Sequence, residues 1–358
     1  MPIMMRTSIE LKENERLLFL FVKVRARRLQ SEKFTAKVPS SIPRLVLVLF
    51  ASMLGGSIIP ASAEPSNASN LKTGTHGKMI ASMAAKTDKE NRVPAPFYEA
   101  LRKALKKRKL KVESICNTSD GVAERILEEY GAMFLAVKKV TPPPVCVFTT
   151  EEQVTRFQEA AGYATETIAD AEIQLQPEAM KALLKAREEA QKDSLDITPR
   201  GGTEAARRNY DDSMRLWATR FLPALDYWLG QERLTAEQVS RLRNLRLHDQ
   251  VAEVLELEKS GIFFSKDLSK SILYSIAAPG TSQHIAMLAL DVTEFQDPRV
   301  REILAKHGWF QTVLSDLPHF TFLGLKEKDL PKHGLKSVEA DGQIFWIPNV
   351  VRPTEPTD

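Results

Sequence analysis

The chain lacks the short motifs that mark the commonest hydrolases. No H-E-x-x-H sequence occurs among its 358 residues, which excludes the usual metalloprotease helix, and no G-x-S-x-G sequence provides a serine nucleophile elbow. Histidine is scarce, with six residues in the whole chain. Any histidine-based site must therefore be built from a small number of candidates.

Cysteine is scarcer still, and its two occurrences leave two alternatives open. Cys116 and Cys146 do not form a C-x-x-C pair, and neither has the histidine partner motif of a thiol nucleophile. In an oxidising compartment they would form one disulfide, which would stabilise the fold by about 3–4 kcal/mol through loop closure. The alternative is a pair of buried free thiols.

The chain also lacks an excess of positive charge outside its N-terminal segment. The formal net charge is +4, but residues 1–63 contain ten Lys and Arg against four Asp and Glu, a net of +6. Residues 64–358 therefore carry a net charge of −2. Net charge gives no support for nucleic-acid binding.

The basic N-terminal segment resembles a targeting sequence. Arg44 precedes a short apolar run at 45–54, and Ala61-Ser62-Ala63 fits an A-x-A cleavage site. The apolar run is shorter than the roughly 20 residues of a transmembrane helix. We expect 1–63 to be a signal peptide or an uncleaved anchor that associates with the membrane, and 64–92 to be a flexible linker. Either case predicts export to the periplasm or cell envelope.

Beyond the linker, the patterns predict two regions. An N-terminal α/β region is expected over 93–193, with helices at 97–111, 120–130, 151–161 and 177–191 and strands at 132–140 and 145–148. A second domain is expected over 194–350, with a helical insertion at 210–260. Its other elements are strands at 271–276, 288–292, 309–314 and 320–323, a helix at 297–307, and a hairpin turning at Asp341-Gly342.

His284, Asp291 and His319 form a candidate metal-ligand set in this second domain. Three N and O ligands leave a fourth position for water on zinc, which lowers the pKa of that water to roughly 7. Asp291 lies in a nearly continuously apolar segment, where a carboxylate is costly unless it is paired or bound to a metal. Asp316, three residues before His319, is a candidate general base.

The segment from Ser282 to Asp291 resembles the S-x-H-x-x-G-x-A-x-D signature of the zinc D-alanyl-D-alanine carboxypeptidases and dipeptidases of the vancomycin-resistance type. Asp316-Leu-Pro-His319 is similar to the second motif of that family, E-x-W-H. The resemblance implies Zn²⁺ on His284, Asp291 and His319, with Asp316 as the base. Met287 replaces the family glycine, Pro318 the tryptophan, and Asp316 the glutamate.

The same resemblance implies substrate-binding residues. The family has an arginine in a loop between a strand and a helix, and Arg200 is at the matching place, with Arg207 and Arg208 as alternatives. Its guanidinium would hold a carboxylate or stabilise an oxyanion. Ser282 is expected to bind substrate or to orient a ligand.

The predicted fold is therefore α+β, with a small, mainly antiparallel sheet, flanking helices, a zinc cleft and a helical insertion. The predicted function is zinc-dependent hydrolysis of D-amino-acid peptides in peptidoglycan, with stem peptides as substrate. Two alternatives remain: a related endopeptidase cutting another wall bond such as L-Ala-D-Glu, and a non-catalytic wall-binding protein that retains the fold.

Overall fold

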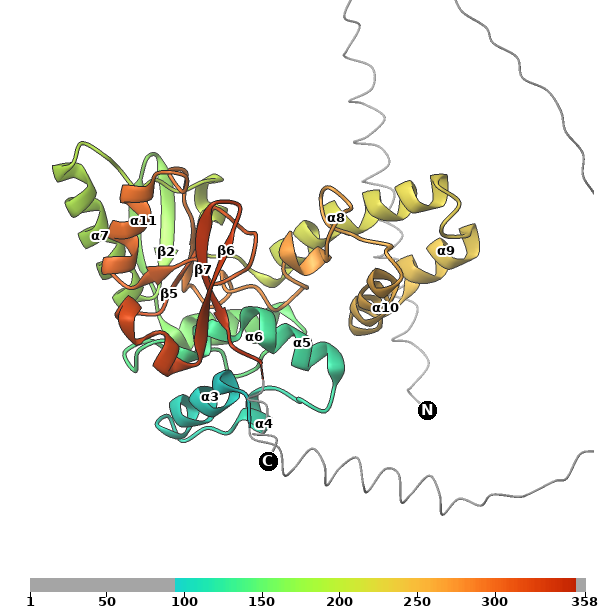
Figure 1. Ribbon diagram of the computed structural model, residues 1–358, viewed down its shortest axis with the longest axis horizontal. Coiled ribbons are helices and arrows are strands. Elements are labelled where there is room, and N and C mark those ends of the chain that lie inside the picture. Colours follow the sequence, from blue (N-terminus) through green and yellow to red (C-terminus); the bar gives the residue numbers. More distant parts are fainter. Residues whose placement is uncertain (1–93, 352–358) are drawn as a thin grey trace, which may run out of the picture. The chain divides into compact units, whose positions relative to one another are not determined.

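The computed structural model of the chain describes residues 94–351, so the predictions for the N-terminal segment 1–63 and the linker 64–92 lie outside the described residues. The described part is an α+β fold, as predicted, with many helices and small antiparallel sheets (Figure 1). Among the described residues, no helix combines the length and the apolar character needed to cross a membrane.

The helices of the described chain begin and end as follows. The α-helices are α3 (Pro96–Lys106), α4 (Val112–Ile115), α5 (Gly121–Tyr130), α6 (Glu151–Ala161), α7 (Pro177–Lys192), α8 (Tyr210–Gly230), α9 (Ala236–Asn244), α10 (Leu247–Lys259) and α11 (Pro298–Lys306). Short 3-10 helices are η1 (Gly131–Leu135), η2 (Gly202–Ala205), η3 (Ile272–Tyr274), η4 (Glu327–Asp329) and η5 (Pro331–His333).

The strands of residues 94–351 form three small sheets, all with antiparallel pairing. A hairpin joins β1 (Ala164–Ile168) to β2 (Ala171–Leu175), and a second hairpin joins β6 (Leu335–Ala340) to β7 (Gln343–Pro348). The central sheet has the order β3-β5-β4, from β3 (Ala289–Asp291), β5 (His319–Phe322) and β4 (Trp309–Phe310). The β6–β7 hairpin turns at the predicted Asp341-Gly342.

The predicted starts of two helices, α5 and α6, are confirmed. A capping side chain lies at each start. Asp120 accepts hydrogen bonds from the backbone N–H groups of Val122 and Ala123 at the start of α5. Thr150 accepts from the Gln153 N–H at the start of α6. Such caps satisfy N–H groups that have no partner inside the helix.

Three predicted strands are wrong. The apolar segment 132–140 begins within the 3-10 helix η1, residues 145–148 form no strand, and 271–276 contains the 3-10 helix η3. Short apolar runs do not by themselves distinguish a strand from another buried segment. The β1–β2 hairpin was not predicted.

Two buried apolar cores meet along α5. The larger core includes residues of α3, α7, α11 and the central sheet, and α5 contributes Ala123 and Leu127 to it. The smaller core lies among α8, α9, α10 and residues 262–278, and α5 contributes Val122, Ile126 and Tyr130. The predicted 210–260 segment is indeed helical, and its helices pack against the rest of the described chain through this second core.

Of the two alternatives for the cysteines, the structure shows the disulfide. Cys116 and Cys146 are bonded, with a sequence separation of 30 residues. The backbone N–H of Cys146 also donates to the Ile115 carbonyl, at 2.9 Å. The bond therefore connects the end of α4 to the segment that leads to α6.

Replacing both cysteines by alanine is expected to lower the free energy of unfolding by about 3–4 kcal/mol, because the unfolded chain regains the entropy of the open loop. Urea unfolding of the double variant beside the wild type measures this difference. Wild type treated with a reductant is the matched control and should lose a similar amount. A loss below about 1 kcal/mol in both would show that loop closure contributes little here.

Candidate metal centre

His284 lies in a tight series of turns that precedes the central sheet. The N–H of Phe148 donates to the Gly280 carbonyl at 2.9 Å, which fixes the start of this series. Gly280 has a φ of 76°, and a Cβ there would lie 1.9 Å from the Phe148 carbonyl oxygen. Only glycine fits this approach. The turns that follow bury His284 to 1% exposure.

Asp291 and His319 come from neighbouring strands. Asp291 ends β3, His319 begins β5, and the two residues are direct cross-strand partners. Directly opposed residues on one face of an antiparallel pair have Cβ atoms about 4.5–5.5 Å apart. The strand register therefore brings together two residues that are 28 positions apart in the sequence.

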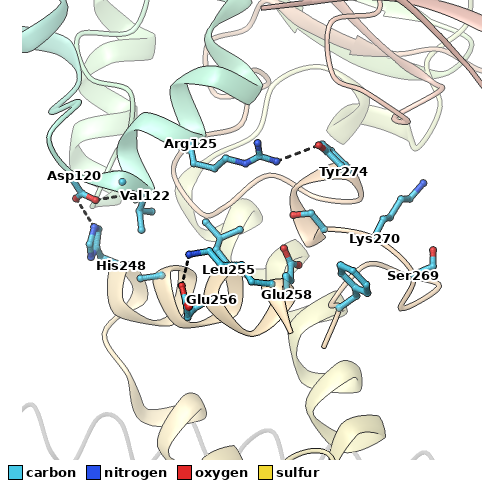
Figure 2. Close-up of a pocket in the computed structure, with 15 residues that line it drawn as sticks. Asp120, Val122, Arg125, His248, Leu255, Glu256, Glu258, Ser269, Lys270 and Tyr274 are labelled. Carbon is cyan, nitrogen blue, oxygen red and sulfur yellow. Dashed lines mark hydrogen bonds and ion pairs between the residues drawn. The ribbon is translucent and has the colours of Figure 1, made fainter. Parts of the chain in front are cut away.

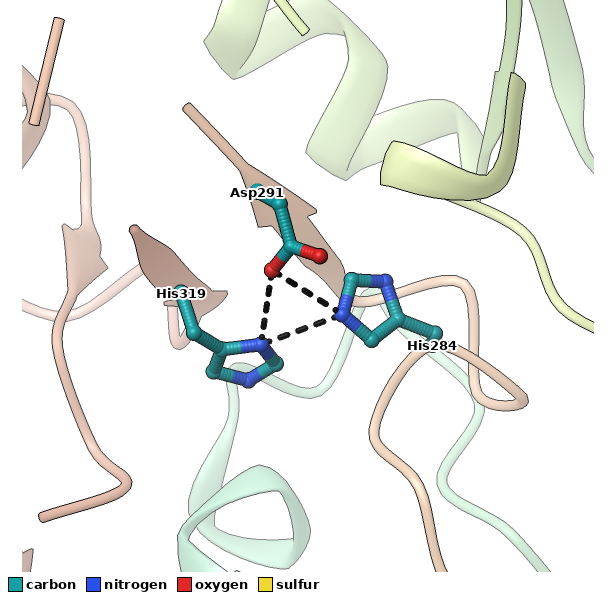
Figure 3. A group of neighbouring side chains, drawn as sticks. All are labelled: His284, Asp291 and His319. Atoms are coloured by element: carbon teal, nitrogen blue, oxygen red, sulfur yellow. Dashed lines mark hydrogen bonds and ion pairs between the residues drawn. The ribbon is translucent and has the colours of Figure 1, made fainter. Parts of the chain in front are cut away.

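The three side chains converge on one point, as Figure 3 shows. His284 Nε2 lies 3.1 Å from His319 Nδ1 and 3.3 Å from Asp291 Oδ1. His319 Nδ1 lies 3.2 Å from the same Asp291 oxygen. These atoms form a nearly equilateral triangle, and such a buried His-Asp-His group could hold a metal ion.

The outward nitrogens of both imidazoles face acceptors, which determines where the protons lie. His284 Nδ1 donates to the Ala206 backbone carbonyl at 2.8 Å, and His319 Nε2 donates to Gln283 Oε1 at 2.8 Å. The inward nitrogens of the neutral rings then carry lone pairs. Two lone pairs and a carboxylate oxygen that face one another form a donor set that could hold a metal ion.

Arg208 completes the surroundings of Asp291. Its Nη2 donates to Asp291 Oδ2 at 2.6 Å, so that Oδ1 remains directed at the two histidines. Its Nε donates to the Glu204 carbonyl at 2.9 Å, which holds the guanidinium in place. Charge-assisted hydrogen bonds of this kind are the strongest in proteins.

The charges in the site keep the ligands in the forms that bind metals. Burial, together with the positive charge of Arg208, lowers the pKa of His284 to about 4, so the ring is neutral at physiological pH. Burial opposes ionisation of Asp291, but neighbouring positive charge, including that of Arg208, holds its pKa well below the usual range. A neutral imidazole at His284 and an ionised carboxylate at Asp291 are the forms that bind metals.

A small cavity of about 30 Å³ adjoins the triangle, with room for about one water molecule. Asp316, Arg208 and Ser282 line it beside the two histidines, and Leu273, Ile276, Ala277 and Val313 form apolar parts of its wall. Burial raises the pKa of Asp316 to about 6, and the negative charge of Asp291 adds to the effect. The predicted base and the predicted ligands are thus brought together.

Arg200 lies outside the lining of this cavity. Its backbone N–H donates to the Asp291 carbonyl at 2.8 Å, so the loop does run beside β3. Its side chain is exposed, with the guanidinium carbon 5.2 Å from the centre of the Phe295 ring, and it is absent from the cavity lining. Arg208, one of the two alternatives, is the arginine at the cavity.

Ser282 lies beside His284 at the cavity, where it could orient this ligand or bind substrate, the two roles that were predicted for it. It is 7% exposed, lines the cavity, and its Oγ accepts from the His284 N–H at 3.3 Å. Sequence reasoning gave no role to Gln283, Thr312 or Thr321, which lie behind His319. Strand alternation offered a signal for Thr321, because it lies two residues from His319 and so on the same face of β5.

Met287, at the position of the family glycine, has a φ of 55° and is fully buried. This left-handed conformation favours glycine and costs other residues roughly 1–2 kcal/mol. The Met287 N–H donates to the His284 carbonyl at 3.0 Å, and its carbonyl accepts from the Gln176 N–H at 3.0 Å. Met287 therefore adopts the left-handed backbone conformation that favours glycine.

We expect Met287→Gly to be about 1 kcal/mol more stable than Met287→Ala, because only glycine adopts this φ without strain. Met180, which is also buried but lies within helix α7, is the matched control. There the order should reverse, with Met180→Gly about 1 kcal/mol less stable than Met180→Ala. Thermal unfolding of the four variants measures both differences. The same order at both positions would argue against backbone strain at Met287.

A much larger cavity, of about 870 Å³, lies between α5 and α10 (Figure 2). Its charged side chains are largely engaged: His248 Nε2 lies 2.6 Å from Asp120 Oδ2, and Lys259 pairs with Glu256 at 2.5 Å. Arg125 donates to the Tyr274 hydroxyl at 3.3 Å. Within the described chain, the group that could hold a metal lies at the small cavity and not here.

No protein-family model matches this chain, and no curated protein is significantly similar to it in sequence. The resemblance to the zinc D-alanyl-D-alanine carboxypeptidases therefore continues to rest on the motif residues alone.

Proposed function

We propose that this chain is an exported zinc peptidase that hydrolyses D-amino-acid peptides of bacterial peptidoglycan, with a D-alanyl-D-alanine carboxypeptidase-like activity. The observation that carries the proposal is the convergence of His284, Asp291 and His319 at 3.1–3.3 Å, with every outward hydrogen bond satisfied. The motif resemblance supports the substrate class.

The dimensions of the triangle support zinc. Ligand bonds of about 2.0–2.1 Å in a tetrahedral arrangement place neighbouring ligand atoms about 3.3 Å apart. The observed separations of 3.1, 3.2 and 3.3 Å are close to this value. Two imidazoles and one carboxylate with a fourth open position are the donor set of a catalytic rather than a structural zinc ion.

Zinc bound here would polarise a carbonyl group and lower the pKa of water. Asp316, at the cavity wall, would accept the proton that water gives up on attacking the peptide and pass it to the leaving amine. Arg208 would hold Asp291 with one oxygen turned inward, and its positive charge would favour a substrate carboxylate or an oxyanion nearby. Ser282 would fix the backbone at His284.

Two further observations support export. The basic segment, apolar run and A-x-A site of residues 1–63 fit a secretory signal or an anchor. The Cys116–Cys146 disulfide fits an oxidising compartment.

One observation favours the second candidate, a non-catalytic wall-binding protein. The cavity of about 30 Å³ accepts about one water molecule, which is less room than a peptide substrate needs beside the ligands. A protein that had lost catalysis would not need that room.

The test is to incubate the zinc-supplied full chain with a stem pentapeptide ending in D-Ala-D-Ala and to identify the products by mass spectrometry. Release of D-alanine would support the carboxypeptidase, and cleavage between L-Ala and D-Glu would support the endopeptidase. Bound zinc without any cleavage would favour the wall-binding protein. A folded chain that takes up no zinc would overturn the peptidase proposal.

A further inference from the structure

A closed set of buried polar side chains lies directly behind His319. Gln283 is 1% exposed, and Thr312 and Thr321 are each 0% exposed. Gln283 Oε1 accepts from His319 Nε2 at 2.8 Å and also from the Thr321 hydroxyl. Buried polar groups in proteins almost always form hydrogen bonds. The donor and the acceptor in each contact of this set can therefore be assigned.

The Gln283 amide has one orientation that satisfies its neighbours. Its Nε2 donates to the Tyr130 backbone carbonyl at 2.9 Å, and a carbonyl only accepts. Its second N–H then faces Thr312 Oγ1 at 3.3 Å, and Thr312 and Thr321 share a hydrogen bond of 2.7 Å. The Thr321 hydroxyl donates to Gln283 Oε1, which closes a ring in which each group both gives and receives.

This ring determines the tautomer of His319. Because Gln283 Oε1 is an acceptor, a neutral His319 ring carries its proton on Nε2, and its Nδ1 keeps its lone pair. In the other tautomer, an Nδ1–H would donate to Asp291 Oδ1, 3.2 Å away. That internal hydrogen bond would occupy both ligand atoms and close the metal position.

We propose that Gln283 is a positioning residue of the metal centre, which holds His319 in the Nε2–H tautomer and so keeps Nδ1 available to a metal ion. The inference rests on the metal-binding part of the proposed function and deepens it. The motif resemblance assigns Gln283 no role, because the residue between the serine and the first histidine is variable in the S-x-H pattern.

The test compares Gln283→Met, which keeps the length of the side chain, with Thr321→Val, which keeps its shape. Gln283→Met removes the acceptor for His319. Thr321→Val leaves that acceptor in place, and the Thr312 hydroxyl, 3.4 Å from Gln283 Oε1, can donate to it instead. Outer hydrogen-bond partners of metal ligands typically change metal affinity about 10–100-fold.

We expect the zinc dissociation constant of the full chain, measured by chelator competition, to rise about 10–100-fold in Gln283→Met and less than about tenfold in Thr321→Val. The nitrogen chemical shifts of His319, measured by NMR on metal-free protein, should show the Nε2–H tautomer in the wild type and a shift toward Nδ1–H in Gln283→Met. A merely structural role would not change the tautomer.

Gln283→Glu is the second variant, should Gln283→Met fail to fold. Its carboxylate still accepts from His319 and Thr321, so the Nε2–H tautomer should persist. Unchanged zinc affinity and an unchanged tautomer in Gln283→Met, or an Nδ1–H tautomer in the wild type, would overturn the inference. A wild type without zinc would instead count against the proposed function, while the tautomer measurement would still decide the role of Gln283.

Discussion

Replacing His319 by alanine is expected to abolish stoichiometric zinc binding, from about one ion per chain to almost none, because the site offers three protein ligands and zinc needs them all. Loss of an outer partner alone costs about 10–100-fold in affinity, so loss of a ligand should cost more. Inductively coupled plasma mass spectrometry on purified protein measures the metal directly.

His248→Ala is the matched control for this change. His248 also contacts a carboxylate, with Nε2 2.6 Å from Asp120 Oδ2, but its side chain is 55% exposed and lies at the larger cavity. Its loss should leave the zinc content unchanged. Equal zinc in His319→Ala and the wild type would remove His319 from the ligand set, whereas loss of zinc in His248→Ala would indicate a different site.

The second large effect is expected from Asp316→Asn, which should retain zinc while hydrolysis falls about 10²–10⁴-fold. The amide keeps the size of the side chain but cannot accept the proton, and general bases contribute that range of rate. Asp316 lies in the cavity wall and is not among the ligand atoms of the triangle, so metal binding and turnover should separate. Zinc content and peptide cleavage are measured on the same preparation.

Asp170→Asn serves as the control, since Asp170 is an exposed residue in the turn between β1 and β2 and should alter neither quantity. Asp316→Glu tests reach: the extra methylene extends the carboxylate toward the water, and higher activity would show that the aspartate limits the rate. Full activity in Asp316→Asn would instead exclude Asp316 as the base.

The sequence by itself determined the elements whose signals are local. The capped starts of α5 and α6 and the Asp341-Gly342 turn depend on side chains within a few residues of each other. Asp291 could also be singled out, because a carboxylate in an apolar strand needs a partner wherever the strand lies. The partners that the structure gives it, Arg208 and the two histidines, meet that need.

Only the tertiary structure decided which distant groups meet. Whether an apolar run such as 271–276 becomes a strand depends on a neighbour to pair with, and here it contains η3, which contributes Leu273 to the wall of the small cavity. The path of the chain between β2 and α8 decides that Arg208, and not Arg200, lines the cavity. The hydrogen bonds of Gln283 connect His319 to residues that are far from it in the sequence, among them Tyr130 and Thr312. Such contacts are set by packing and strand register rather than by spacing along the chain. The alternation along β5, which puts Thr321 on the same face as His319, is the one local signal among them.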